Sequence, residues 1–178
     1  MRSIKLGSLF GLEMRVAPIS FLIGSLALWI VLIMIAMSLL AMLWFDALIG
    51  SLLAVILHWV GEIAHQFGHA WGARRIGYPM FGIRLGTLGL FSTSLYPRDE
   101  PPLPARLHIT RALGGPLGSF IVSLATGVIV IALDPIGGIA RALAWFFLLE
   151  NFFVFGLGAF LPLGFNDGST ILEWWNKR

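Results

Sequence analysis

Two histidines four residues apart, His65 and His69, stand within an almost unbroken apolar stretch of the sequence. At this spacing they share one face of a helix, so both imidazoles can bind the same metal ion. In the zinc-binding helix motif His-Glu-x-x-His, the glutamate after the first histidine is the general base. Here that position holds Gln66, whose amide cannot take up a proton at neutral pH. The motif therefore predicts a metal site that lacks its catalytic base.

Further polar side chains extend the histidine pair into a stripe. His58 and Glu62 precede His65 and His69 at steps of four, three and four residues, which places all of them on one helical face. Polar groups inside an apolar helix are functional candidates, and this stripe fits a solvated groove, a proton path or a metal site. Asp167, just after the last long apolar segment, is expected at the same depth and is the candidate third ligand. The alternative for Asp167 is a plain Asn-Asp-Gly turn.

The composition is that of a membrane protein. Hydrophobic residues make up 58% of the chain and charged residues only 12%. The 178 residues suffice for about four helices that span a bilayer, at about 20 residues each. The chain has no cysteine, which excludes disulfides and thiolate ligands. Its few arginines are not interleaved with aromatic residues on a polar face, so we expect a lipid bilayer as partner and no nucleic acid.

The predicted fold class is a membrane α-helical protein with a short β-hairpin-like segment between the second and third spans. Glycines punctuate residues 80–96, and their partial alternation is closer to strand than to helix spacing. An irregular amphipathic loop is the alternative for this segment. We expect one domain over residues 1–178, with spans at about residues 18–45, 48–74, 105–133 and 140–161.

The cations are distributed unequally over the two ends of these spans. Alternate sides for successive spans leave Arg141 alone on one side. By the positive-inside rule, the sequence predicts an integral, multi-pass protein of a prokaryotic cell membrane with both termini in the cytoplasm. The histidine pair would lie toward the cytoplasmic side. That side receives Arg2, Lys5, Arg15, Arg74, Arg75, Arg84, Arg98, Arg106, Arg111, Lys177 and Arg178.

Taken together, these elements resemble the site-2 protease family of intramembrane zinc metalloproteases. The resemblance covers about residues 57–172, and the order of its elements is more specific than any one of them. Those elements are the pair His65/His69, the Arg74-Arg75-Ile76-Gly77 that follows, Gly114-Gly115-Pro116-Leu117, and the stretch from Pro162 to Asp167-Gly168. The connecting segments leave no room for a PDZ domain, so the chain resembles a minimal member.

The resemblance implies a fold, a cofactor and a set of site residues. It implies a three-helix core in which Zn²⁺ is bound by His65, His69 and Asp167, and a transmembrane protein as substrate. A hairpin-like segment would align that substrate. The candidate substrate-binding residues are Gly86, Thr87, Leu88, Gly89 and Leu90, together with Asn151, which could instead pair with the polar stripe, as could Glu150.

Three departures from the family pattern accompany this resemblance. Gln66 stands where the family has its catalytic glutamate. Phe165-Asn166 replaces the common Pro-Leu before Asp-Gly, and Ala159 stands where many members carry asparagine.

The sequence leaves several functions open. An intramembrane zinc protease that is inactive through Gln66 is the main hypothesis, and Gln66 is either an engineered replacement of glutamate or the mark of a natural pseudoprotease. Glu62, one turn before His65, is an alternative base. A metal-binding membrane transporter that uses the polar stripe as a path is the alternative from another class, although the chain lacks the repeated broken helices of many transporters. A structural membrane protein without a site is the last.

Overall fold

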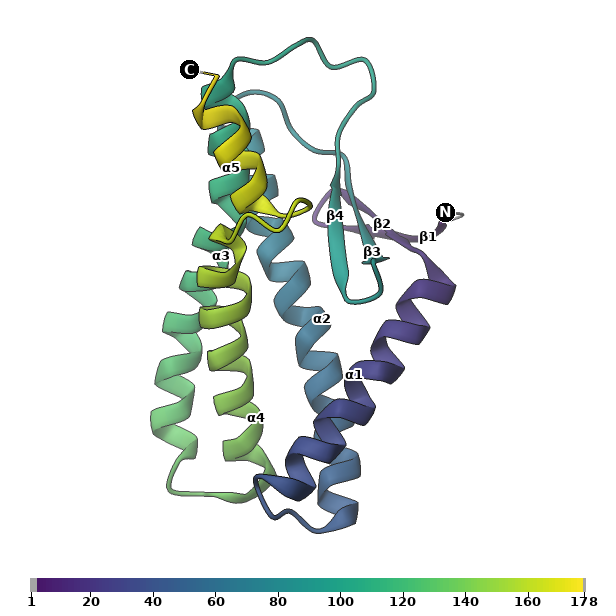
Figure 1. The fold of residues 1–178 in the computed structure, drawn as a ribbon, viewed down its shortest axis with the longest axis vertical. Helices are drawn as coiled ribbons and strands as arrows, with labels where there is room; N and C mark the ends of the chain where they lie inside the picture. The colour runs from purple at the N-terminus through teal and green to yellow at the C-terminus, as the bar shows by residue number, and fades with distance from the viewer. Residues whose placement is uncertain (1–2, 178) are drawn as a thin grey trace.

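The computed structural model describes residues 3–177. Figure 1 shows a helical bundle with a small sheet beside one end, where both ends of the described chain also lie. Arg2 and Arg178, two of the cations counted above, fall outside the described residues. In chain order the elements are β1 (Ile4–Leu9), β2 (Leu12–Val16), α1 (Pro18–Ser38), α2 (Trp44–Arg75), β3 (Gly82–Thr87), β4 (Phe91–Leu95), α3 (Ala105–Leu133), α4 (Gly138–Leu149), the π-helical η1 (Glu150–Leu157), the 3₁₀ turn η2 (Gly158–Phe160) and α5 (Asp167–Trp175).

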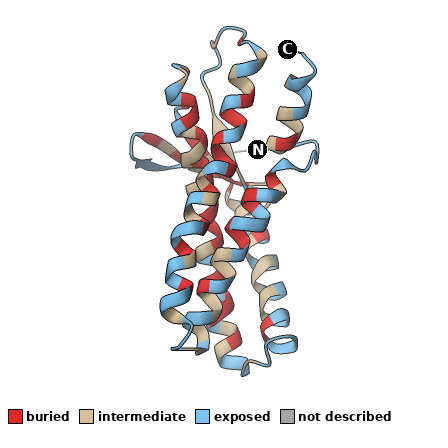
Figure 2. Cartoon of the chain, turned by 90° about the vertical axis from the view of Figure 1, so that its left-hand side faces the viewer, coloured by how far each residue is buried: buried red, intermediate tan, exposed pale blue. Residues whose placement is uncertain are grey.

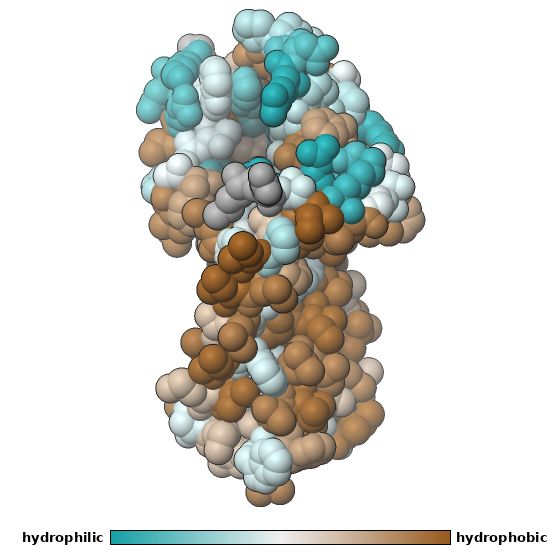
Figure 3. All heavy atoms as spheres, turned by 90° about the vertical axis from the view of Figure 1, so that its right-hand side faces the viewer, coloured by the Kyte–Doolittle hydropathy of each residue, from teal (hydrophilic) through white to brown (hydrophobic). Residues whose placement is uncertain are grey.

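Four of the described helices are long and apolar enough to cross a membrane, as the sequence predicted. They are Pro18–Ser38, Trp44–Arg75, Ala105–Leu133 and Gly138–Phe160. The first ends at Ser38 and not near Phe45, because residues 39–43 turn the chain into α2. Figure 3 shows a hydrophobic surface over the bundle and hydrophilic residues gathered at the end with the sheet. The chain is therefore an integral membrane protein.

The sheet has four strands in the order β1-β2-β3-β4. The predicted hairpin between the second and third spans is confirmed as antiparallel β3 and β4. Strands β1 and β2 were not predicted, although Leu12, Met14 and Val16 alternate with two charged residues at strand spacing. Strand β2 pairs with β3 in parallel, so helices α1 and α2 form the connection between adjacent strands.

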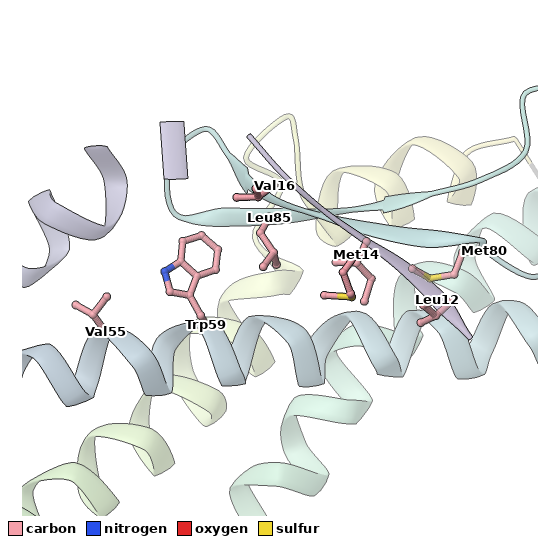
Figure 4. Packing of buried hydrophobic residues seen from close by; sticks show 8 residues of the cluster. Leu12, Met14, Val16, Val55, Trp59, Met80 and Leu85 are labelled. Atoms are coloured by element: carbon pink, nitrogen blue, oxygen red, sulfur yellow. The ribbon is translucent and has the colours of Figure 1, made fainter. Parts of the chain in front are cut away.

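The inner face of this sheet packs on α2 (Figure 4). Trp59 of α2 lies under the sheet and stacks on Phe21 of α1, with ring centroids 4.4 Å apart. Its indole nitrogen donates to Ser25 Oγ at 3.0 Å, which satisfies the polar atom of this buried ring. The packing fixes the hairpin against the helix that carries the histidines. The buried cluster is Leu12, Met14, Val16, Val55, Trp59, Met80, Ile83 and Leu85.

Helices α2 and α3 approach each other through glycines. A Cβ atom on Gly68 would lie 2.2 Å from the carbonyl oxygen of Gly114, and one on Gly118 would lie 3.1 Å from Gly68 Cα. Small residues at four-residue spacing let membrane helices touch along their backbones. Figure 2 shows the buried residues along the inner sides of the helices, with exposed residues on their outer sides.

We predict that Gly114→Ala destabilises the bundle. Its Cβ would lie 2.4 Å from the Gly68 carbonyl oxygen, so the two helices must separate, at a cost of about 1–3 kcal/mol. Gly127→Ala is the matched control, because it lies on the same helix with no other atom within 4 Å of its Cβ position. Thermal unfolding in detergent should show a lower Tm for Gly114→Ala only. Equal melting temperatures would contradict the close backbone contact.

Candidate metal centre

His65, His69 and Asp167 converge at the end of the bundle that lies beside the sheet. The Nε2 atoms of the two histidines are 3.1 Å apart. Asp167 places Oδ2 3.1 Å from His65 Nε2 and Oδ1 3.3 Å from His69 Nε2. A tetrahedral zinc ion with bonds of about 2.0–2.1 Å spaces its ligand atoms by about 3.3 Å. One ligand atom from each of the three side chains lies within 4.8 Å of the others, close enough for all three to bind one ion.

The other ring nitrogens of the two histidines are held by α3. His69 Nδ1 lies 2.8 Å from the carbonyl oxygen of Arg111 and 3.2 Å from the amide nitrogen of Gly115. His65 Nδ1 lies 3.0 Å from Ser119 Oγ. Such outer contacts orient metal-binding imidazoles and leave Nε2 with its lone pair toward the ion. Neither Arg111 nor Ser119 was singled out by the sequence, because their contacts with α2 depend on how the helices pack.

Gly115 leaves space in front of both Nε2 atoms. A Cβ atom at this position would lie 2.3 Å from His69 Nε2 and 2.4 Å from His65 Nε2. These distances are close to a zinc–nitrogen bond. The missing side chain therefore opens the volume that an ion bound by these histidines needs, and the donor set fits zinc.

Asp167 is the first residue of α5, and its neighbours fix its position. Asn166 is the N-cap of α5, and its side-chain oxygen accepts from the amide of Ser169. The amide nitrogen of Asn166 donates to the carbonyl oxygen of Leu161 in the preceding loop. A Cβ on Gly168 would lie 2.3 Å from the Phe160 carbonyl oxygen, so only glycine permits this approach. The Asn-Asp-Gly sequence thus begins helix α5, which was not predicted from the sequence.

The electrostatics keep Asp167 ionised. Burial raises the pKa of its carboxyl group, but the imidazoles of His69 and His65 have the larger combined effect and lower it to about 2. A deprotonated carboxylate is the form in which this side chain can bind a cation.

A cavity of about 550 Å³ opens beside the three candidate ligands. Its walls come from α2, β4, α3, the end of the fourth span and the start of α5. Ser92, Thr93 and Ser94 of β4 line the cavity on one side, and apolar residues of the last span line it on the other. The lining includes Glu62, His65, Gln66, His69, Phe91, Ser92, Thr93, Ser94, Tyr96, His108, Arg111, Phe155, Leu161, Phe165 and Asp167.

Residues 86–90, which the sequence predicted as a substrate edge, do not line this cavity. Gly86 and Thr87 end β3, and residues 88–90 form the turn to β4, with positive φ at Gly86, Leu88 and Gly89. This turn packs on α1, where a Cβ on Gly86 would meet Phe21 at 2.7 Å. The carbonyl oxygen of Leu90 lies 2.9 Å from His58 Nε2. The strand beside the cavity is β4 itself, which begins at Phe91.

Gln66 and Asn151 also differ in their surroundings. Gln66 lines the cavity beside the candidate ligands, and its Oε1 accepts from Ser94 Oγ at 2.6 Å. Asn151 is fully buried in η1 and does not line the cavity. Its Nδ2 donates to the Phe147 carbonyl oxygen, and its Oδ1 has no partner among the described residues.

Arg111 links the cavity to the loop between β4 and α3. Its guanidinium forms a bidentate ion pair with Glu100 and lies 4.1 Å from the ring centre of Tyr96. One of its nitrogens also donates to the Tyr78 carbonyl oxygen at 2.6 Å. The pKa of the Glu100 carboxyl lies below its ordinary value because Arg111 donates to it. One residue therefore fixes the loop with its side chain and orients His69 with its carbonyl group.

One solved structure matches the fold over almost the whole chain. It is the site-2 protease from Methanocaldococcus jannaschii, with a TM-score of 0.59 and 20% sequence identity over 99% of this chain and 72% of that chain. No protein-family model and no curated protein sequence matches. At this identity the likeness shows a shared fold, and a fold alone does not determine an activity.

We predict that Gly115→Ala abolishes zinc binding although it removes no ligand. Its methyl group would occupy the space in front of both Nε2 atoms, so the zinc content of the purified chain should fall at least about tenfold. His65→Ala should lose zinc to the same extent, while Gly127→Ala should keep it. Elemental analysis measures all three. Zinc retained by both Gly115→Ala and His65→Ala would contradict this centre.

Proposed function

We propose that this chain is an intramembrane zinc metalloprotease of the site-2 protease type, inactive with Gln66 in place of glutamate. The observation that carries the proposal is the convergence of His65, His69 and Asp167 around the space left by Gly115. The shared fold with a site-2 protease supports it. The proposed substrate is the transmembrane segment of another membrane protein.

The chemistry follows from the side chains around the cavity. A zinc ion held by the three ligands would supply a Lewis acid for the scissile carbonyl and for water. Hydrolysis also needs a base to take the proton of the attacking water, and in the related motif that base is the residue after the first histidine. Gln66 has the shape of this glutamate but no carboxylate. Glu62, the alternative base, instead directs Oε2 to the Ser92 amide.

Strand β4 is the proposed site of substrate alignment. A transmembrane helix hides its peptide bonds in internal hydrogen bonds, so it must unwind before cleavage. An extended segment can regain these bonds by pairing with the edge of a sheet. Strand β4 is the edge strand of the sheet, and Ser92, Thr93 and Ser94 line the cavity beside the candidate ligands. These residues replace the turn residues 86–90 as the proposed edge.

The proposed orientation has both termini in the cytoplasm and the metal centre toward the cytoplasmic side of the membrane. The sheet and α5 lie at one end of the bundle, and the turn between α3 and α4 lies at the other (Figure 1). Among the described residues, the cations other than Arg141 belong to the end with the sheet or to the adjoining helix ends. The positive-inside rule places that end in the cytoplasm.

We predict that Gln66→Glu creates protease activity. A general base contributes about 10²–10⁴-fold to such reactions, so cleavage of a single-span substrate in detergent should rise by this factor. His69→Ala in the same background should remove the gained activity. No cleavage by a Gln66→Glu chain that contains zinc would refute the protease and favour a pseudoprotease.

The orientation is tested with two single cysteines in this cysteine-free chain. Asp99 and Ile136 are exposed at opposite ends of the bundle. A membrane-impermeant maleimide should label Ile136→Cys in intact cells and Asp99→Cys only after the membrane is permeabilised. The reverse pattern would show that the proposed topology is inverted.

A further inference from the structure

Three buried polar side chains, His58, Glu62 and Glu150, are not explained by the metal centre. His58 and Glu62 belong to the polar stripe of α2, and Glu150 is the first residue of η1. Their exposed fractions are between 3% and 9%. Burying such groups is costly unless they are paired, so their partners show what they do.

The partners of His58 and Glu62 are backbone groups of Leu90, directly before β4, and of Ser92 within β4. His58 Nε2 lies 2.9 Å from the carbonyl oxygen of Leu90, which can only accept, so Nε2 donates. Glu62 Oε2 accepts from the backbone amide of Ser92 at 2.8 Å and also from the Ser92 hydroxyl. The Leu90 carbonyl and the Ser92 amide therefore both bond to side chains of α2.

This pair of contacts has the pattern of a β-ladder. A neighbouring strand offers one N–H to a carbonyl of the edge and one C=O to an amide two residues further on. His58 supplies the donor and Glu62 supplies the acceptor at those two places. Strand β4 has no neighbouring strand on this side, because it is the last strand of the sheet.

The spacing of helix and strand makes this match possible. Four residues of helix advance by about 6 Å, and two residues of strand by about 6.8 Å. His58, Glu62 and Gln66 are four residues apart on α2, and their partners Leu90, Ser92 and Ser94 are two apart. One face of α2 therefore bonds in register to the edge of the hairpin.

Glu150 holds the imidazole of His58, which donates to the Leu90 carbonyl, in place. Its Oε1 lies 2.8 Å from His58 Nδ1, so the imidazole is held from both sides. Glu150 stands where the fourth span changes from α-helix to the wider π-helix, a geometry that is frequent at functional sites. His58, held by Glu150, and Glu62 thus both bond to the backbone of residues 90–92.

We propose that His58 and Glu62 imitate a neighbouring strand and keep the edge of β4 closed until an extended peptide displaces them. This proposal rests on the proposed function for the nature of that peptide, an unwound membrane span. A helix with intact internal hydrogen bonds cannot replace the two side chains, whereas an extended backbone brings both a donor and an acceptor. We call His58 and Glu62 on the edge of β4 the cap. The cap therefore selects segments that unwind.

The test measures peptide binding in the chain with Gln66, so it does not depend on hydrolysis. The probe is a synthetic apolar peptide of about 20 residues with a central Gly-Pro pair and one cysteine, in detergent micelles. Thr93→Cys on β4 reports its binding by disulfide yield, because the chain has no other cysteine. Ser8→Cys, on the opposite edge strand, is the positional control.

Glu62→Ala should raise the disulfide yield at Thr93→Cys by about three- to tenfold, since the side chain that accepts from the Ser92 amide no longer closes the edge. Glu62→Gln keeps an acceptor oxygen and should stay near the parent. Ser92→Pro added to Glu62→Ala should cancel the gain, because it removes the amide that the peptide needs. Glu173→Ala, an exposed carboxylate on α5, should change nothing. Zinc content reports that each variant is folded.

Three results would overturn the cap. They are an unchanged disulfide yield with Glu62→Ala, a gain that survives Ser92→Pro, and an equal gain at Ser8→Cys. The two proposals fail separately. A raised yield without cleavage by Gln66→Glu would refute the protease and leave the cap intact. Cleavage without a raised yield would refute the cap alone.

Discussion

The contact between the glycines of α2 and α3 is the constraint on which the rest of this structure depends. Backbones that touch at Gly68 and Gly114 bring Arg111 and Ser119 within reach of the two histidine rings. Both contacts act on Nδ1, so both Nε2 atoms are left toward the same point. Larger residues would separate the helices, and the imidazoles would lose the partners that orient them.

Helix α2 serves two structures with one face. Its last turns carry the candidate metal ligands, and its middle turns bond to the edge of β4. The metal centre and the contacts with β4 both depend on side chains four residues apart on α2. This spacing lets two histidines reach one metal ion, and it also equals the length of two residues of strand. The polar stripe is thus largely satisfied by protein groups, which favours a structured site over the open path that a transporter would need.

The sheet is held by apolar packing on one face and by polar contacts at one edge. Trp59 anchors the inner face, while Ser92 and Ser94 meet Glu62 and Gln66 one and two turns further along the same helix. These contacts fix the position of β4 along the axis of α2, beside the candidate ligands. A free strand edge is otherwise a site for unwanted pairing, and buried polar side chains are a compact way to close it.

Features that depend on local composition and period could be predicted from the sequence. Apolar runs gave four spans, and the spacing of His65 and His69 placed both on one helical face. It could not determine contacts between distant segments. The parallel pairing of β2 with β3, the partners of His58 and Glu62, and the position of β4 beside the cavity all depend on how helices and sheet pack. Those contacts join segments far apart in the chain, so no local period encodes them and they become visible only in the folded molecule.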